Sequence, residues 1–245
     1  MEMEMEIDAL LKLMKKRKSI RRFKPDPIPE GHVEKILEAA RWAMSGSNSQ
    51  PWEFIVVKDK ATRQKIAELH AVNNKDNYII ESTRVKEMRH LNYLEPSDEL
   101  PGFKDAPVLI VVGADPRVLQ AQTIPMHFYG GGEGGPLGPY YKNIANATQF
   151  IHLAAAALGL GSQWVSLNNN WEPALKRLLD VPDIISLQTI VPIGYPAYKP
   201  AAPYRRKLKE MVHYDKYDRS KYRTVEDIRD FILELRQRTS KAYKV

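Results

Sequence analysis

The chain of 245 residues contains no cysteine. This absence excludes disulfide bonds, thiolate nucleophiles and every zinc or iron-sulfur site built on cysteine ligands. A long apolar run is missing too, because a membrane-spanning helix needs about 18 to 20 apolar residues and the longest candidate is IHLAAAALGL at 151–160. The acidic start MEMEMEID has neither the basic nor the apolar part of a secretory signal. We therefore expect a globular, cytoplasmic protein without membrane association.

Signatures of catalysis by side chains are also scarce. The six histidines form no HExxH motif or other close ligand pair, so no metal site is predicted. The chain has no G-x-S-x-G nucleophile motif, and no two carboxylates stand out as an acid and base pair. The glycine-rich stretch at 127–141 lacks the Gly-Lys-Ser/Thr ending of a phosphate-binding loop, and we interpret it as a loop or lid. No catalytic side chain is predicted.

The charge balance is basic but mixed. The net charge is +7, with 37 Lys and Arg against 30 Asp and Glu along the chain, which favours a solvated surface over a nucleic-acid interface. Two basic clusters stand out, at 15–24 and 204–209. In the first, a hydroxyl and an apolar residue interrupt the charges, so the guanidinium groups could hold a phosphate while Ile20 anchors the segment. A solvated charged turn is the alternative interpretation.

Hydrophobic spacing predicts alternating helices and strands in one domain. A first helix ends near the first basic cluster, a second begins after Pro29, and Asp59 or Thr62 caps a third. Thr224 opens a terminal helix with Asp227 as its capping partner. An irregular stretch is expected at 73–105, and Asp115-Pro116 has the order of a helix start. Strands are predicted at 54–57, 107–113, 163–167 and 189–194, and further helices at 143–158 and 173–179.

Five segments occur in the order found in the nitroreductase family of flavin enzymes, which the chain resembles. They are RKSIRRF at 17–23, SGSNSQPWEFIVV at 45–57, ALGLGSQWV at 157–165, LQTIVPIGYP at 187–196 and RRKLKEMVHYD at 205–215. The resemblance implies an α+β nitroreductase-like fold, with a central, mostly antiparallel sheet of four or five strands flanked by helices, in an intertwined homodimer. Residues 1–245 would form a single FMN-binding domain with its core at about 15–217. Residues 218–245 would form a C-terminal extension that packs on the partner subunit.

The resemblance also implies a set of FMN-binding residues. The first segment would hold the phosphate, the ribityl chain and the pyrimidine edge of the ring, a turn would reach the flavin across the dimer, a strand end would lie near N5, and a late arginine would bind the phosphate. Arg21 would stabilise negative charge at the N1 and O2 edge, and the backbone N–H of Leu167 would hydrogen-bond N5. In that order, the residues are Arg17, Lys18, Ser19 and Arg21; Ser45, Asn48 and Gln50; Val165, Ser166 and Leu167; and Arg205 and Arg206.

The implied reaction is a ping-pong transfer of reducing equivalents from NAD(P)H through FMN to a small acceptor such as a nitroaromatic or a quinone. Reductive dehalogenation and oxidative fragmentation of the flavin to a benzimidazole are alternatives from the same family, and nucleic-acid binding is a more distant one. The sequence departs from the family pattern where Met44 and Lys207 replace common prolines. Regions 73–105 and 120–142 match nothing in the family pattern. In the former, charged residues could contact a zwitterionic substrate or form a solvated helix; they are Glu81, Arg84, Lys86 and Glu87.

Overall fold

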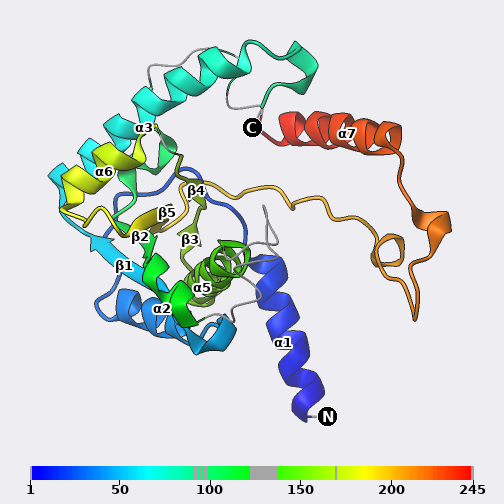
Figure 1. The fold of residues 1–245 in the computed structure, drawn as a ribbon, viewed down its shortest axis with the longest axis horizontal. Helices are drawn as coiled ribbons and strands as arrows, with labels where there is room; N and C mark the ends of the chain where they lie inside the picture. Colours follow the sequence, from blue (N-terminus) through cyan, green and yellow to red (C-terminus); the bar gives the residue numbers. More distant parts are fainter. Residues whose placement is uncertain are drawn as a thin grey trace. The chain divides into compact units, whose positions relative to one another are not determined.

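A computed structural model describes residues 2–90, 93, 95, 99–121, 137–168 and 170–243 (Figure 1). The chain forms two compact units. The first comprises Met1–Asn73 and Glu99–Lys199, and the second comprises Asn74–Asp98 and Pro200–Val245.

The centre of the first unit is a five-stranded antiparallel sheet with the order β1-β2-β5-β3, in which β4 also pairs with β5. Its strands are β1 (Trp52–Val57), β2 (Val108–Ala114), β3 (Gly161–Ser162), β4 (Val165–Ser166) and β5 (Ser186–Gly194). Every residue of β2 is buried, as its β-branched, apolar sequence predicts. The predicted mostly antiparallel sheet is confirmed.

Helices cover both faces of this sheet, so each strand sends alternate side chains into two different cores. On one face, Val108, Ile110 and Val112 pack with α2 (His32–Arg41) and α5 (Leu137–Ala157). On the other, Leu109 and Val111 pack with α3 (Lys60–Glu81) and α6 (Glu172–Leu179) (Figure 1). The predicted α+β class is therefore correct.

The N-terminal helix α1 (Glu2–Lys16) ends beside the first basic cluster, as its spacing predicts, and it contacts α5. Its apolar stripe remains 40–49% exposed in the single chain and consists of Ile7, Leu10, Leu11 and Met14.

Helix ends follow the predicted local chemistry. The carboxylate of Asp59 accepts hydrogen bonds from the backbone N–H and the hydroxyl of Thr62, each at 2.7 Å, which caps the start of α3. Gly159 takes a left-handed conformation, φ 76°, just after α5 ends, the usual position for a terminating glycine.

The structure corrects several element boundaries. α3 continues to Glu81 instead of ending near residue 73, since no glycine or proline interrupts it. α5 begins at Leu137, six residues earlier than predicted, because Pro139 falls in its first turn, where proline is tolerated. The strand predicted at 163–167 shrinks to β4, and the helix expected after Asp115 is a 3₁₀ helix, η5 (Pro116–Ala121). Residues 122–136, most of the predicted glycine-rich lid, lie outside the described residues.

The second unit contains the end of α3, η2 (Lys86–Met88), η7 (Leu208–Glu210), η8 (Arg219–Lys221) and α7 (Val225–Tyr243). α7 starts with the predicted capping box: the Asp227 N–H donates to the Thr224 hydroxyl at 3.1 Å, and the Thr224 N–H donates to the Asp227 carboxylate at 2.8 Å. The Arg236 guanidinium donates hydrogen bonds to the carbonyls of Glu87, Met88 and Arg89. Arg236 thereby ties α7 to the segment after α3.

None of the helices in the described part of the chain combines the length and the apolar character that crossing a membrane requires.

Candidate functional site

The basic segment at 17–24 is fixed to one end of the sheet by backbone contacts. Ser19 forms a parallel bridge with Ser162 of β3, and the Ile20 N–H donates to the Ser162 carbonyl at 2.9 Å. Further along, the Lys24 N–H donates to the Tyr195 carbonyl at 2.9 Å. The segment therefore extends the edge of the sheet as an ordered backbone.

The apolar residues of this segment hold it in place. Ile20 and Phe23 are each 4% exposed, and Ile20 sits directly against Gly161. A Cβ atom at Gly161 would lie 2.6 Å from Ile20 Cγ1 and 2.9 Å from Ile20 Cβ. Only glycine leaves room for Ile20 at this position, which confirms the predicted anchoring of the segment by Ile20.

The polar residues of the segment lie between these anchors. Arg17, Lys18 and Arg21 are half-buried and Ser19 is exposed. Three cations and a hydroxyl on a fixed backbone make a donor set suited to a phosphate monoester and a polyol chain. The segment is therefore a candidate anion site at the edge of the sheet.

A buried histidine lies behind this segment. His152 on α5 is 4% exposed, and its Nδ1 lies 2.8 Å from the hydroxyl of Ser162, itself 2% exposed. Burial, followed by the positive charge of Arg17, lowers the pKa of His152 to about 4. The imidazole is therefore neutral at neutral pH and forms a hydrogen bond inside the protein.

The predicted strand end at 165–167 lies close to the basic segment. Val165 belongs to the same core as Ile20. β4 pairs with Thr189 and Ile190 of β5, and β3 pairs with Ile193 and Gly194 of the same strand. The fully buried Thr189 donates its hydroxyl to the Val165 carbonyl at 2.8 Å. The segments at 17–21 and 165–167 thus share one core through Ile20 and Val165, with β4 paired to the middle of β5 and β3 to its end.

The turn after α2 has an unusual backbone. Ser47, Asn48 and Gln50 all have φ between 44° and 55°, a left-handed conformation that costs a non-glycine residue about 1–3 kcal/mol. The Ser45 hydroxyl accepts the Gln50 N–H at 3.0 Å, and the side chain of Asn143 on α5 accepts the Gly46 N–H at 3.1 Å. Backbone strain of this kind is concentrated at functional sites.

The turn and Ser162, the β3 residue that bridges to the basic segment, bond to opposite sides of α5 within one chain. Asn143 bonds to the turn and His152 bonds to Ser162. These two residues are separated by about two and a half helical turns, roughly 13 Å along the helix. One chain therefore does not gather the two predicted groups of residues around a single point.

Arg205 and Arg206 belong to the second unit, where their surroundings differ. The Arg206 Nε lies 3.5 Å from the Glu210 carboxylate, and its Nη2 donates to the Glu210 carbonyl at 3.0 Å. The exposed Arg205 donates to the carbonyl of Tyr204 at 2.8 Å, and no carboxylate of the described residues pairs with it. Among the residues that the structure describes, Arg206 is thus ion-paired within its unit, whereas Arg205 has no carboxylate partner.

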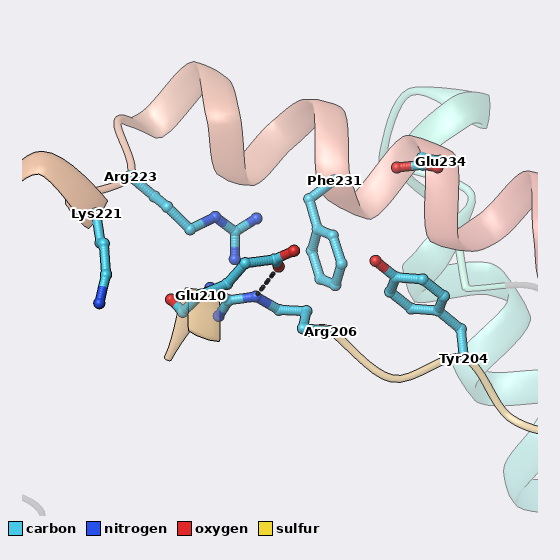
Figure 2. A pocket seen from close by; sticks show the side chains of 7 residues that line it. All are labelled: Tyr204, Arg206, Glu210, Lys221, Arg223, Phe231 and Glu234. Atoms are coloured by element: carbon cyan, nitrogen blue, oxygen red, sulfur yellow. Dashed lines mark hydrogen bonds and ion pairs between the residues drawn. The ribbon is translucent and has the colours of Figure 1, made fainter. Parts of the chain in front are cut away.

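Arg206 also lines a cavity of about 340 Å³ in the second unit. Figure 2 shows Arg206 and Glu210 facing each other beneath α7. The Arg223 guanidinium lies 4.5 Å from the centre of the Phe231 ring. The cavity is lined by Tyr204, Arg206, Glu210, Lys221, Arg223, Phe231 and Glu234.

The sequence does not single out some residues that shape the site. His152 has no metal-binding partner at helical spacing, and Ser162 and Thr189 are ordinary strand residues in the sequence. Their roles depend on contacts between elements distant in the chain. Within the described ranges, no three histidine or carboxylate side chains converge closely enough to bind a metal ion.

The geometry defines a class of protein first: an α+β fold in which a basic segment is fixed at the edge of the sheet. The sequence model of the nitroreductase family matches residues 14–195, and the chain therefore belongs to the nitroreductase family of flavoproteins.

Three similar proteins illustrate the range of this family. The chain is 31% identical over 209 residues to 5,6-dimethylbenzimidazole synthase of Rhodospirillum rubrum, covering 82% of this chain and 88% of the relative. It is 29% identical over 204 residues to NADH dehydrogenase of Thermus thermophilus, covering 80% and 91%. A solved structure of oxidised iodotyrosine deiodinase bound to FMN and 3-iodo-L-tyrosine is similar with a TM-score of 0.65 and 26% identity, covering 85% of this chain and 100% of that one.

Proposed function

We propose that the chain is an FMN-dependent oxidoreductase that transfers reducing equivalents from NAD(P)H to a small acceptor such as a nitroaromatic or a quinone. The observation that carries this proposal is the fixed basic segment beside the end of β4. Its ordered backbone is held at Ile20, which shares an apolar core with Val165, and it carries three cations and a hydroxyl. The similar deiodinase structure, which contains FMN, supports the choice of this cofactor.

The residues of the chain have separate roles in this proposal. FMN, when bound, supplies the hydride and electron transfer. Arg17, Lys18 and Ser19 hold the phosphate and the ribityl chain, because guanidinium, ammonium and hydroxyl groups are the donors that such oxygens accept. Arg21 stabilises negative charge at the pyrimidine edge of the ring, and the backbone N–H of Leu167 donates to N5. No side chain of the protein needs to titrate for these roles.

The cofactor site is completed by a second copy of the chain. The turn with Ser45, Asn48 and Gln50 bonds to Asn143, on the side of α5 opposite His152 and Ser162, so in a homodimer the partner's turn would supply these groups. Exposed apolar side chains near the turn support such an interface, with Trp42 71% and Met44 80% exposed. The apolar stripe of α1 would be covered in the same dimer, and the extension at 218–245 of the single FMN-binding domain would pack on the partner subunit.

Of the two late arginines, Arg205 is the better phosphate ligand. Arg206 has the carboxylate of Glu210 as a partner, so moving Arg206 to a phosphate would break this partly exposed ion pair, at a cost of up to about 1 kcal/mol. Arg205 has no such partner among the described residues and stays exposed. Arg205→Ala is expected to weaken FMN binding more than Arg206→Ala, and equal losses would remove the distinction.

The electron donor is tested with the FMN-loaded protein under anaerobic conditions. NADH or NADPH should bleach the yellow absorbance, and a nitroaromatic or a quinone should restore it. If both nucleotides leave the colour unchanged, the protein is a flavoprotein that is not an NAD(P)H reductase.

Reductive dehalogenation is the second candidate, because of the similarity to the deiodinase structure. The charged residues after α3 argue against it as the first choice. The Glu81 carboxylate already accepts the His90 N–H at 3.0 Å and pairs with Arg84 at 3.2 Å, so binding a zwitterion there would require breaking these contacts. Anaerobic release of iodide from 3-iodo-L-tyrosine would favour this candidate. Formation of a benzimidazole after oxygen is admitted to the reduced protein would favour flavin fragmentation instead.

A further inference from the structure

We propose that His152 is a positioning residue of the cofactor site: its hydrogen bond to Ser162 fixes the part of β3 on which the segment Arg17–Arg21 is built. This inference rests on the proposed FMN site and deepens it, because it assigns the site a support that lies outside the cofactor-binding segments.

Ser162 joins α5 to the basic segment. Its hydroxyl lies 2.8 Å from His152 Nδ1, and its backbone forms the bridge to Ser19, which includes the 2.9 Å hydrogen bond from the Ile20 N–H to the Ser162 carbonyl. A shift of Ser162 is therefore passed directly to the backbone between Arg17 and Arg21.

β3 needs this additional support because it is only two residues long. It pairs with β5 through Gly161 and Ser162, opposite Gly194 and Ile193, and Gly161 contributes no side chain. A strand of this length forms few backbone hydrogen bonds to its neighbour, so it is easily displaced. The side-chain hydrogen bond from His152 on α5 supplies a second constraint on the position of Ser162.

Burial makes the bond effective. His152 and Ser162 are 4% and 2% exposed, so water cannot readily replace either partner, and removing one leaves the other without its hydrogen bond. The tilted ring of Trp164 lies 6.2 Å from the imidazole and helps to enclose it. The low pKa of His152 keeps the imidazole neutral beside Arg17, so that it orients Ser162 without adding a second positive charge behind the segment.

The test measures the dissociation constant of FMN by flavin fluorescence, with full-length wild type and variants. His152→Phe keeps a ring of similar size but removes the hydrogen bond. His152→Asn keeps an amide near the position of Nδ1 but loses the ring. Ser162→Ala removes the hydroxyl. His70→Phe is the matched control, because His70 is a half-buried histidine that packs against Phe103 and Trp171 and not against Ser162.

The positioning role predicts a particular ranking. His152→Phe and Ser162→Ala should each weaken FMN binding about three- to tenfold, the range of one buried hydrogen bond. The double variant should bind FMN no more weakly than the single variant with the lower affinity, since both substitutions remove the same hydrogen bond. His152→Asn should bind within about twofold of wild type, and His70→Phe should bind like wild type even where its thermal stability is lower.

Other results overturn the inference. If His152→Phe binds FMN like wild type while His152→Asn does not, His152 acts through packing alone. If the effects of His152→Phe and Ser162→Ala add, the two residues do not act through a shared bond. Should His152→Phe fail to fold, Ser162→Ala carries the same prediction with a far smaller change. A wild type that binds no FMN would overturn the proposed function and this inference with it. Variants that bind FMN as tightly as wild type would overturn this inference alone.

Discussion

Gly161→Ala tests whether the basic segment is built on β3 as described. The new Cβ would lie 2.6 Å, 2.9 Å and 3.0 Å from Cγ1, Cβ and Cγ2 of Ile20, whereas carbon atoms in contact are normally about 3.5–4.0 Å apart. Ile20 is branched at Cβ and buried, so it cannot rotate away. Either Ile20 or the strand must move by up to about 1 Å, and overpacking of this kind costs about 1–3 kcal/mol.

Urea unfolding followed by circular dichroism measures this loss, and FMN titration measures its effect on the site. The free energy of unfolding should fall by about 1–3 kcal/mol, and FMN affinity should fall with it because the Ile20–Ser162 hydrogen bond is displaced. Gly46→Ala is the stability control, since a Cβ there meets nothing within 4 Å, and it should change stability by less than about 0.5 kcal/mol or increase it slightly. If Gly161→Ala is as stable as Gly46→Ala, the close packing of Ile20 is refuted.

Three further predictions follow from single contacts. Burial lowers the pKa of His70 and His152 from 6.5 to about 4, so the folded state binds fewer protons than the unfolded state, and stability is full above pH 6.5 and falls as the pH drops towards 4. Urea unfolding at pH 7 and pH 5 should differ by about 2 kcal/mol per histidine, and equal midpoints would contradict these shifts. Thr224→Ala removes the capping box of α7 and should cost about 1 kcal/mol, seen as faster amide exchange in its first turns; unchanged exchange would count against the cap. Thr189→Val removes the hydrogen bond to the first residue of β4 and should cost about 1–2 kcal/mol, whereas an equally stable variant would show that this bond contributes nothing.

Local chemistry made much of the fold predictable from the sequence. A carboxylate or a hydroxyl at a helix start, as at Asp59 and Thr224, acts within three residues, so its effect is visible in the sequence. The strand at 107–113 is equally clear, because a run of β-branched residues buried on both faces needs no knowledge of its neighbours. The positions of these elements depend on local patterns, and the structure confirms them.

The site was only partly predictable, for physical reasons. The left-handed backbone at Ser47, Asn48 and Gln50 has no glycine to announce it and is held by Asn143, almost a hundred residues away. The bond between His152 and Ser162 likewise joins two elements through tertiary packing. The resemblance to the nitroreductase family identified the segments, but it did not reveal the contacts that support them.

The absorbance spectrum of the purified protein after incubation with FMN and removal of the unbound cofactor tests the central claim most directly. The account predicts a yellow protein that retains about one FMN per chain, released on denaturation and identified by chromatography. A colourless protein that is folded by circular dichroism and takes up no FMN would contradict it.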